Sequence, residues 1–307
     1  CEGSFYMREK VEIIAEVGSN HGFDLDLARK YIVAAEKQGA DVVKFQSIRK
    51  EKLFSQKILK DGKVVDNPIW SQVSNLDFPE EWHQKLKKCA DDVEIEFMST
   101  PFYLEAVDVL ETVGVKRYKI ASGDVTFVPL LEKVGRTGKP VILSTGACSI
   151  GDVENALQIL NATGVGEIIL LHCVVSYPPQ WEEMNLKAIA TLKTEFGLPV
   201  GISDHSPGSL VPIAAVAIGA SVIEKHVTFD RLLPGPDHPF AMTMNEFGDM
   251  VQQVRLLEQA LGTGEKVPTE DELNRQHRMR RGVYDPNTLK PTVGSTGIWL
   301  RPEHSKL

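Results

Sequence analysis

The sequence predicts an α/β fold, a (β/α)8 TIM barrel with a short C-terminal extension. Short apolar runs rich in β-branched residues recur eight times in the first three-quarters of the chain, and segments of helical periodicity lie between them. Such continuous apolar runs are typical of parallel strands that are buried on both faces. Eight strand–helix repeats fit a barrel of ~250 residues. A doubly wound open sheet is the alternative, but no GxGxxG motif follows the first predicted strand.

The predicted strands and helices alternate along the chain. The strands are expected at Val11–Glu16, Asp41–Gln46, Glu94–Ser99, Lys116–Ala121, Pro140–Thr145, Glu167–His172, Leu198–Ser203 and Ala220–His226. Helical periods lie between them, for example at Leu25–Gly39, Phe102–Gly114, Ile150–Gly164 and Ser209–Gly219, with a last helix near Met244–Leu261. Several of these segments end on a glycine, which is a common helix stop.

The catalytic barrel is expected to span residues 11–274. Residues 1–10 are expected to form an N-terminal extension before it, and residues 275–307 a tail or reduced cap after it. Lys52–Phe78 is a polar connection that is too long for a simple strand-to-helix loop. Loops of this length are usually lids, binding loops or disordered segments.

The charge and the cysteines exclude several classes of protein. The chain has 34 Lys+Arg and 42 Asp+Glu, a net charge of −8, which disfavours nucleic acid and anionic membranes as partners. No apolar run approaches the ~20 residues of a membrane span. The four cysteines show no CxxC spacing, so neither a disulfide framework nor a zinc knuckle is indicated. We expect a cytoplasmic enzyme.

Reactive side chains occur at the ends of all eight predicted strands. In a barrel, catalytic groups come from the C-terminal strand ends and the loops after them. Eight polar strand ends therefore predict an active site at this end of the barrel. The candidates are Glu16, Lys44, Gln46, Thr100, Lys119, Ser122, Asp124, Ser144, His172, Ser203, His205, Glu224 and His226.

Two histidines close adjacent predicted strands. Neighbouring strands lie ~4.8 Å apart, so His205 and His226 can converge on one metal ion. Glu224 lies two residues before His226 on the same strand face, within reach as a further ligand or as a partner of the imidazole. The alternative is that each histidine is a hydrogen-bonded residue at the barrel rim, and the spacing alone leaves both interpretations open.

Two lysines lie within otherwise apolar strands. A buried lysine needs a partner, and an anionic ligand at the barrel mouth would supply one for Lys44 and Lys119. An internal salt bridge to Glu16 or Glu224 is the alternative. A Schiff-base role is also open, because burial frees the amine of its proton.

Several hydroxyl groups and the backbone N–H groups at helix starts could complete a phosphate or carboxylate cradle. Each hydroxyl taken singly is more often a helix N-cap. The hydroxyls belong to Thr100, Ser122, Ser144 and Ser203.

Longer strings resemble the sialic acid synthase family, which includes N-acetylneuraminate, legionaminate and pseudaminate synthases and a spore-coat polysaccharide relative. The resemblance extends from about Ile13 to Asp237 in the family's order. The matching strings are IIAEVGSNHGFDLDLARK, GADVVKFQS, FMSTPF, YKIASGD, PVILSTG, LLHCVVSYP, GISDHS and IEKHVTFDRLLPGPDH.

The resemblance implies a fold and an activity. The family has a (β/α)8 barrel followed by an antifreeze-like domain, which we expect to be missing or reduced here because only residues 275–307 remain. The implied reaction condenses phosphoenolpyruvate with an N-acetylated amino sugar, such as N-acetylmannosamine or a diacetamido hexose. The products are a nine-carbon 2-keto sugar acid and phosphate. The implied cofactor is Mn2+, with Mg2+ or Co2+ as alternatives, and the implied assembly is a homodimer.

The resemblance also implies roles for single residues. His205 and His226 resemble metal ligands, and Glu16 resembles a catalytic carboxylate. The phosphoenolpyruvate cradle would consist of Lys44, Thr100, Lys119, Ser122, Ser144 and Ser203. The acceptor-sugar pocket would be lined by Gln46, Phe102, Asp124, Tyr177 and Asp237. Two other functions remain open, a lysine Schiff-base aldolase or lyase of the TIM-barrel type and a non-catalytic sugar-binding barrel.

Overall fold

A computed structural model describes residues 10–68, 70, 76–279, 281–288, 290, 292 and 297–300. The chain forms two compact units, Cys1–Ala260 and Leu261–Leu307. Residues 1–9 of the predicted N-terminal extension lie outside the described part. Within that part, no helix is both long enough and apolar enough to cross a membrane.

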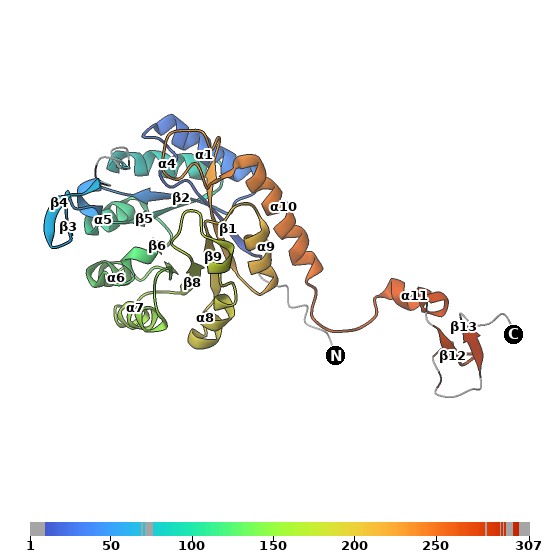
Figure 1. Cartoon of the computed structure of the whole chain (residues 1–307). Helices are drawn as coiled ribbons and strands as arrows, with labels where there is room; N and C mark the ends of the chain where they lie inside the picture. Colours follow the sequence, from blue (N-terminus) through green and yellow to red (C-terminus); the bar gives the residue numbers. More distant parts are fainter. Residues whose placement is uncertain are drawn as a thin grey trace. The chain divides into compact units, whose positions relative to one another are not determined.

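Eight parallel strands of the first unit form the barrel, which confirms the predicted fold class (Figure 1). Hydrogen-bonded neighbours follow the order β5-β2-β1-β10-β9-β8-β7-β6, and β5 and β6, at the two ends of this order, lie side by side. The short strand β11 (Met242–Thr243) pairs with the end of β10. The barrel strands are β1 (Glu12–Glu16), β2 (Val42–Ser47), β5 (Glu96–Pro101), β6 (Tyr118–Ile120), β7 (Val141–Ser144), β8 (Ile168–Cys173), β9 (Val200–Asp204) and β10 (Val222–Thr228).

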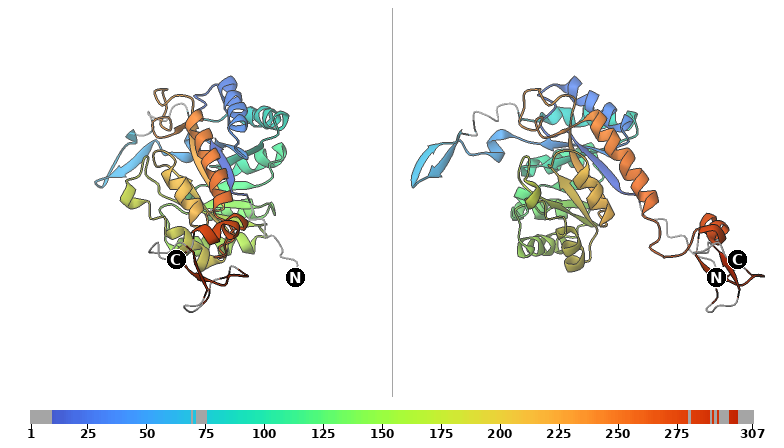
Figure 2. Two further views of the ribbon diagram at one scale, coloured as in Figure 1. Left: turned by 90° about the vertical axis from the view of Figure 1, so that its right-hand side faces the viewer. Right: turned by 45° about the vertical axis from the view of Figure 1, so that its right-hand side comes forward.

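A helix follows each barrel strand and packs on the outside of the barrel (Figures 1 and 2). Local signals explain where helices begin and end: Asp24 caps α1 through its carboxylate, Ser149 and Asp152 form a capping box on α7, and Gly114 ends α5 in a left-handed conformation. The helices are α1 (Leu25–Lys37), α4 (Glu80–Asp92), α5 (Leu104–Val113), α6 (Val128–Gly135), α7 (Ile150–Ala162), α8 (Ala188–Phe196), α9 (Leu210–Ala217) and α10 (Met244–Ala260).

The long connection after β2 contains the short helix α2 (Lys50–Leu53) and a hairpin of β3 (Lys57–Lys60) and β4 (Lys63–Asp66). Asp61 and Gly62 both have positive φ, as a two-residue hairpin turn requires. Most hairpin side chains are exposed, and Figure 2 shows the hairpin projecting from the barrel.

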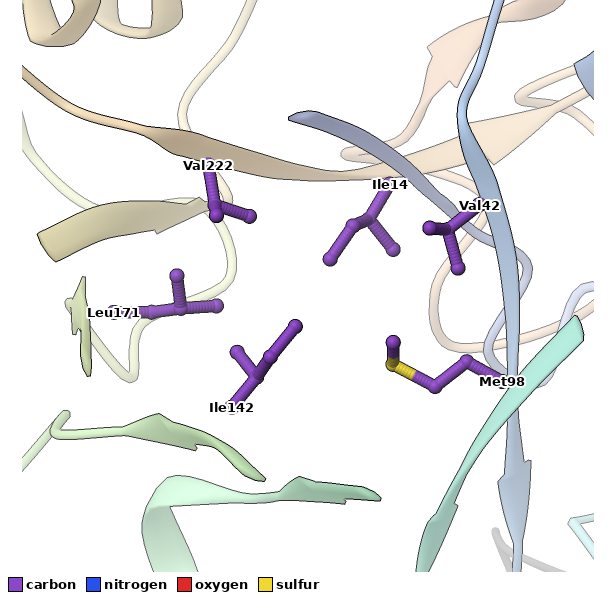
Figure 3. Packing of buried hydrophobic residues seen from close by; sticks show 6 residues of the cluster. All are labelled: Ile14, Val42, Met98, Ile142, Leu171 and Val222. Atoms are coloured by element: carbon purple, nitrogen blue, oxygen red, sulfur yellow. The ribbon is translucent and has the colours of Figure 1, made fainter. Parts of the chain in front are cut away.

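Apolar side chains from six strands meet inside the barrel and form its core (Figure 3). Every one of them is at most 2% exposed. This layer closes the barrel below the C-terminal strand ends, so the interior is a packed core rather than a channel. Its members are Ile14, Val42, Met98, Ile142, Leu171 and Val222.

The second unit contains α11 (Glu270–Met279) and an antiparallel pair of strands, β12 (Gly282–Tyr284) and β13 (Ile298–Leu300). Thr269 and Glu272 form reciprocal hydrogen bonds that start α11. The predicted boundary between residues 274 and 275 therefore falls inside this helix, whereas the break between the two units follows Ala260.

Candidate active site

A polar layer lies directly above the apolar core, toward the C-terminal ends of the strands. Strand side chains alternate between the two faces, so the residue two positions after each core residue also points into the barrel. These positions carry Glu16, Lys44, Thr100, Ser144, Cys173 and Glu224. The barrel interior thus changes from an apolar layer to a layer of polar and ionisable side chains two residues further along each strand.

Two lysines and two glutamates form a buried cluster of alternating charge in this layer. The Nζ of Lys44 lies 2.5 Å from Oε2 of Glu16 and 3.5 Å from Oε2 of Glu224. The Nζ of Lys119 lies 3.2 Å from Oε1 of Glu224. The Nε2 of Gln46 donates to Oε1 of Glu16 at 2.7 Å. The internal ion pairs that the sequence left open as an alternative are therefore present.

Burial and pairing shift the pKa values of this cluster in opposite directions. Burial raises the pKa of Glu16 to about 6, although Lys44 opposes the change. Burial alone would also raise the pKa of Glu224, but the ammonium groups of Lys119 and Lys44 hold it well below its usual value. Burial lowers the pKa of Lys119, whereas the two glutamates overcome burial and raise the pKa of Lys44. Glu16 is thus the carboxyl of the cluster that titrates near neutral pH.

The four predicted cradle hydroxyls surround this cluster but have different partners. Thr100 Oγ1 accepts from Lys44 Nζ at 3.2 Å, and Ser203 Oγ donates to Glu224 Oε1 at 2.8 Å. Ser122 Oγ accepts from the backbone N–H of Gly146 at 2.9 Å. The Oγ of Ser144 is buried and has no hydrogen-bond partner within the described residues. Buried polar groups normally have a hydrogen-bond partner, so the Oγ of Ser144 is free to donate to a further group.

The two predicted metal ligands lie side by side above the cluster. The ring centroids of His205 and His226 are 5.2 Å apart, and Phe240 packs edge-on against both rings. His205 Nδ1 lies 3.2 Å from the carbonyl oxygen of Val174. Because a carbonyl only accepts, Nδ1 carries the proton and Nε2 keeps its lone pair.

Both imidazoles are neutral at pH 7. Burial lowers the pKa of His205 to about 3 and that of His226 to about 4. The Nδ1 of His226 is buried without a hydrogen-bond partner in the described residues, and Oδ2 of Asp237 lies 3.9 Å from it. Neutral imidazole nitrogens and a carboxylate are common ligands of divalent metal ions. Among the described residues, however, no group of three or more His, Cys, Asp or Glu side chains is arranged to hold a metal ion.

The predicted acceptor residues lie around the mouth at different depths. Phe102 is half-buried and follows β5, while Tyr177 is 54% exposed and its ring packs edge-on against His205. Asp124 belongs to the short helix η1 (Ser122–Asp124), its Oδ2 is buried without a partner in the described residues, and burial raises its pKa to about 6. Gln46, by contrast, is part of the charged cluster.

Asp237 is held by residues that the sequence analysis did not select. Its Oδ2 accepts from the N–H and the Oγ of Ser19 at 2.9 and 2.8 Å. Gly18, at φ 55°, allows this approach, because a Cβ there would lie 2.5 Å from the same oxygen. Phe240 was also missed, and its only signal in the sequence is its place three residues after Asp237.

The model of the NeuB family matches residues 31–266 of the chain. The chain belongs to the NeuB family. This confirms the resemblance to sialic acid synthases, and the chain is an enzyme of that type.

Named relatives agree with this assignment. The chain is 41% identical over 280 residues to an N,N'-diacetyllegionaminic acid synthase of Legionella pneumophila, covering 88% of this chain and 79% of the relative. It is 34% identical over 260 residues to the human N-acetylneuraminate-9-phosphate synthase, covering 83% and 72%. The crystal structure of an N-acetylneuraminic acid synthetase from Leptospira borgpetersenii in complex with citrate matches with a TM-score of 0.80 and 36% identity, covering 87% and 90%.

Proposed function

We propose that this protein condenses phosphoenolpyruvate with an N-acetylated amino sugar, forming a nine-carbon 2-keto sugar acid and releasing phosphate, with Mn2+ as cofactor. The observation that carries the proposal is the buried layer in which Lys44 and Lys119 lie below the paired imidazoles of His205 and His226. Cations for an anionic substrate and nitrogens for a metal ion thus face the same mouth. The relatives named above support the reaction class.

The lysines would bind the carboxylate and phosphate of phosphoenolpyruvate. Both ammonium groups are buried, and charge-assisted hydrogen bonds are strong where water is excluded. The Oγ of Ser144 would donate to the same ligand, because it has no partner among the described residues. Thr100, Ser122 and Ser203 would complete the cradle. Fixing the enol in this way supplies orientation, which accounts for a large part of the catalysis in such a bond-forming step.

The reaction needs proton transfer at two oxygens. Carbon-3 of phosphoenolpyruvate attacks the aldehyde carbon of the open-chain sugar, and the aldehyde oxygen takes up a proton. Water adds to carbon-2 and loses one proton, and the hydroxyl group formed gives its remaining proton to the leaving phosphate as the C–O bond breaks, which leaves the ketone. Glu16 would carry a proton between these oxygens, because its raised pKa of about 6 allows it to gain and lose one near neutral pH.

His205 and His226 would hold the metal ion, with Asp237 beside them. A bound divalent ion supplies Lewis acidity, which polarises the aldehyde oxygen. The carbonyl of Val174 keeps Nε2 of His205 unprotonated, and this nitrogen is the one that can bind a metal ion. The acceptor sugar would lie above, against Gln46, Phe102, Asp124, Tyr177 and Asp237.

Phosphate release from phosphoenolpyruvate tests the proposal. We expect release with Mn2+ and N-acetylmannosamine, loss of release with EDTA, and no release in a His205→Ala variant. Diacetamido-trideoxyhexoses form a second arm, and turnover only with them would identify a different acceptor. If neither acceptor supports phosphate release in the presence of Mn2+, the proposal is overturned.

One observation favours a second function. Burial lowers the pKa of Lys119, which would leave more free amine for a Schiff base with a keto acid. Borohydride trapping of Lys119 by pyruvate would support an aldolase or lyase, whereas inhibition by EDTA without trapping favours the metal-dependent synthase.

The family resemblance also supports a homodimer. Light scattering during size-exclusion chromatography tests it, because a monomer and a dimer of this 34.0 kDa chain are easily separated.

A further inference from the structure

A second buried ion pair lies behind the two histidines, on the outer face of the strands. Asp204 and Lys225 are directly opposite each other in the ladder between β9 and β10. The Nζ of Lys225 lies 2.5 Å from Oδ2 of Asp204, and the two side chains are 1% and 0% exposed. Because strand residues alternate, these side chains point away from the barrel interior while Glu224 and His226 point into it.

The side chains of this ion pair contact the chain on both sides of His205. Asp204 Oδ1 accepts from the N–H of Ser206 at 2.9 Å, and Asp204 Oδ2 accepts from Ser206 Oγ at 3.0 Å, which closes a turn with His205 at its centre. The ammonium of Lys225 also donates to the carbonyl oxygen of Ser206. One side chain on β10 therefore contacts the residue before and the residue after His205.

The contacts of Asp204 and Lys225 with Ser206 lie just beyond the end of β9, where the hydrogen bonds of the sheet stop. Strand β9 ends at Asp204, so His205 lies just beyond the regular ladder, whereas His226 is still within β10. The His205 ring packs against Tyr177 and Phe240, and its orientation also depends on the turn and on the hydrogen bond from Nδ1 to Val174. Loss of the Asp204–Lys225 ion pair would let the backbone of His205 move relative to that of His226.

We propose that Lys225 is a positioning residue that fixes His205 so that its Nε2 and the ring of His226 converge on one ion. The part that concerns the ion rests on the proposed function, whereas the orientation of His205 does not. A buried ion pair is weak support for stability, because well-packed apolar residues often replace it without loss. Its contacts on both sides of His205 give this pair a geometric role, and residues that orient metal-binding histidines have large effects on metal affinity.

The test uses the double variant Asp204→Asn/Lys225→Met. The asparagine keeps an oxygen for the N–H of Ser206, and the methionine keeps the apolar stem of the lysine, so no uncompensated charge stays buried. The matched control is Arg255→Met, which breaks the 2.9 Å ion pair between Arg255 and Asp41 at the opposite end of the barrel. Should the double variant not fold, Lys225→Met alone repeats the test, because it removes the same contacts of Lys225 with Asp204 and Ser206.

Two readouts separate the role of Lys225 from the metal hypothesis. The imidazole 15N shifts of His205, measured without metal, report its tautomer and are expected to lose the protonated-Nδ1 signature in the double variant and to keep it in Arg255→Met. The dissociation constant for Mn2+, measured by electron paramagnetic resonance, is expected to rise about 10- to 100-fold in the double variant only.

Unchanged His205 shifts in the folded double variant would overturn the positioning role, whatever the metal affinity. A parent protein that binds no Mn2+ would overturn the metal site of the proposed function, and the shifts would still decide the role of Lys225. Altered shifts with an unchanged Mn2+ dissociation constant would overturn the link from His205 orientation to metal binding.

Discussion

The ammonium group of Lys44 lies 2.5 Å from the carboxylate of Glu16, and both side chains are almost completely buried below the barrel mouth. The two residues are directly opposite each other in the ladder between β1 and β2, so the strand register itself brings them together. The proposed proton carrier is thus held by a lysine that is also proposed to bind the substrate. The proposed roles of Lys44 and Glu16 can each be tested by substitution.

Replacing Lys44 by methionine is expected to reduce phosphate release by about 100- to 1000-fold, because it removes a buried charge-assisted donor from the substrate anion. Steady-state phosphate release at saturating phosphoenolpyruvate measures the effect. Lys37→Met, at an exposed position on α1, is the matched control and should retain the parent rate. Equal rates in the two variants would contradict the role of Lys44.

The raised pKa of Glu16 predicts how stability depends on pH. Glu16 binds its proton more tightly in the folded state, with a pKa of about 6, than at its ordinary value of 4.5. This contribution to stability is therefore complete below pH 4.5 and is lost as the pH rises through 6, a change of about 2 kcal/mol. Urea unfolding between pH 4.5 and 7 should show a loss that is about 2 kcal/mol larger in the parent than in Glu16→Gln, because Asp124, whose pKa is also raised to about 6, titrates in both proteins. Parallel pH profiles would refute the prediction.

Gly18→Ala is expected to destroy activity by displacing Asp237. The new Cβ would lie 2.5 Å from Oδ2 of Asp237 and 3.1 Å from the ring of His226. Gly22→Ala is a close control, because Gly22 has the same left-handed φ, 56° against 55°, but nothing within 4 Å of its Cβ. Both variants should lose about 1–2 kcal/mol of unfolding free energy from backbone strain.

Activity distinguishes the two glycine variants, with phosphate release at matched protein concentration as the measurement. Gly22→Ala should keep most of the parent rate and Gly18→Ala should lose it. Similar rates would show that the position of Asp237 does not matter for turnover.

Truncation of the barrel core should cost far more stability than truncation of the hairpin. Leu171→Ala removes a fully buried side chain from the layer in Figure 3, and we expect a loss of about 2–5 kcal/mol in unfolding free energy. Leu59→Ala on β3, where the side chain is 74% exposed, should change it by less than about 0.5 kcal/mol. Chemical denaturation checks both, and a large effect at Leu59 would mean that the hairpin packs on another surface.

The strand positions followed from the sequence because buried parallel strands leave continuous apolar runs. The predicted strands at Asp41–Gln46 and Leu198–Ser203, for example, each differ from the observed β2 and β9 by one or two residues at their ends. The hairpin of β3 and β4 was missed, although Asp61–Gly62 between short apolar stretches is a hairpin signal. Its strands have only four residues each, too short to stand out within a polar connection.

The sequence predicted which residues line the site better than it predicted which of them contact each other. The apolar strand around Lys44 marked this lysine as buried, and period two placed Glu224 on the same strand face as His226. Which carboxylate each lysine contacts depends on strand register and side-chain reach. The contact of Ser19 with Asp237 joins positions far apart in the sequence, and no local pattern marks it.

The alternation of charge in the buried cluster has a thermodynamic consequence for anion binding. Lys44 and Lys119 already have internal counter-ions in Glu16 and Glu224. An anion bound as proposed would compete with a carboxylate of the protein, so its affinity would be the difference between two ion-pair energies. Such a competition would select against simple monocarboxylates, which offer no gain over a glutamate, and would favour ligands that combine a carboxylate with a phosphate.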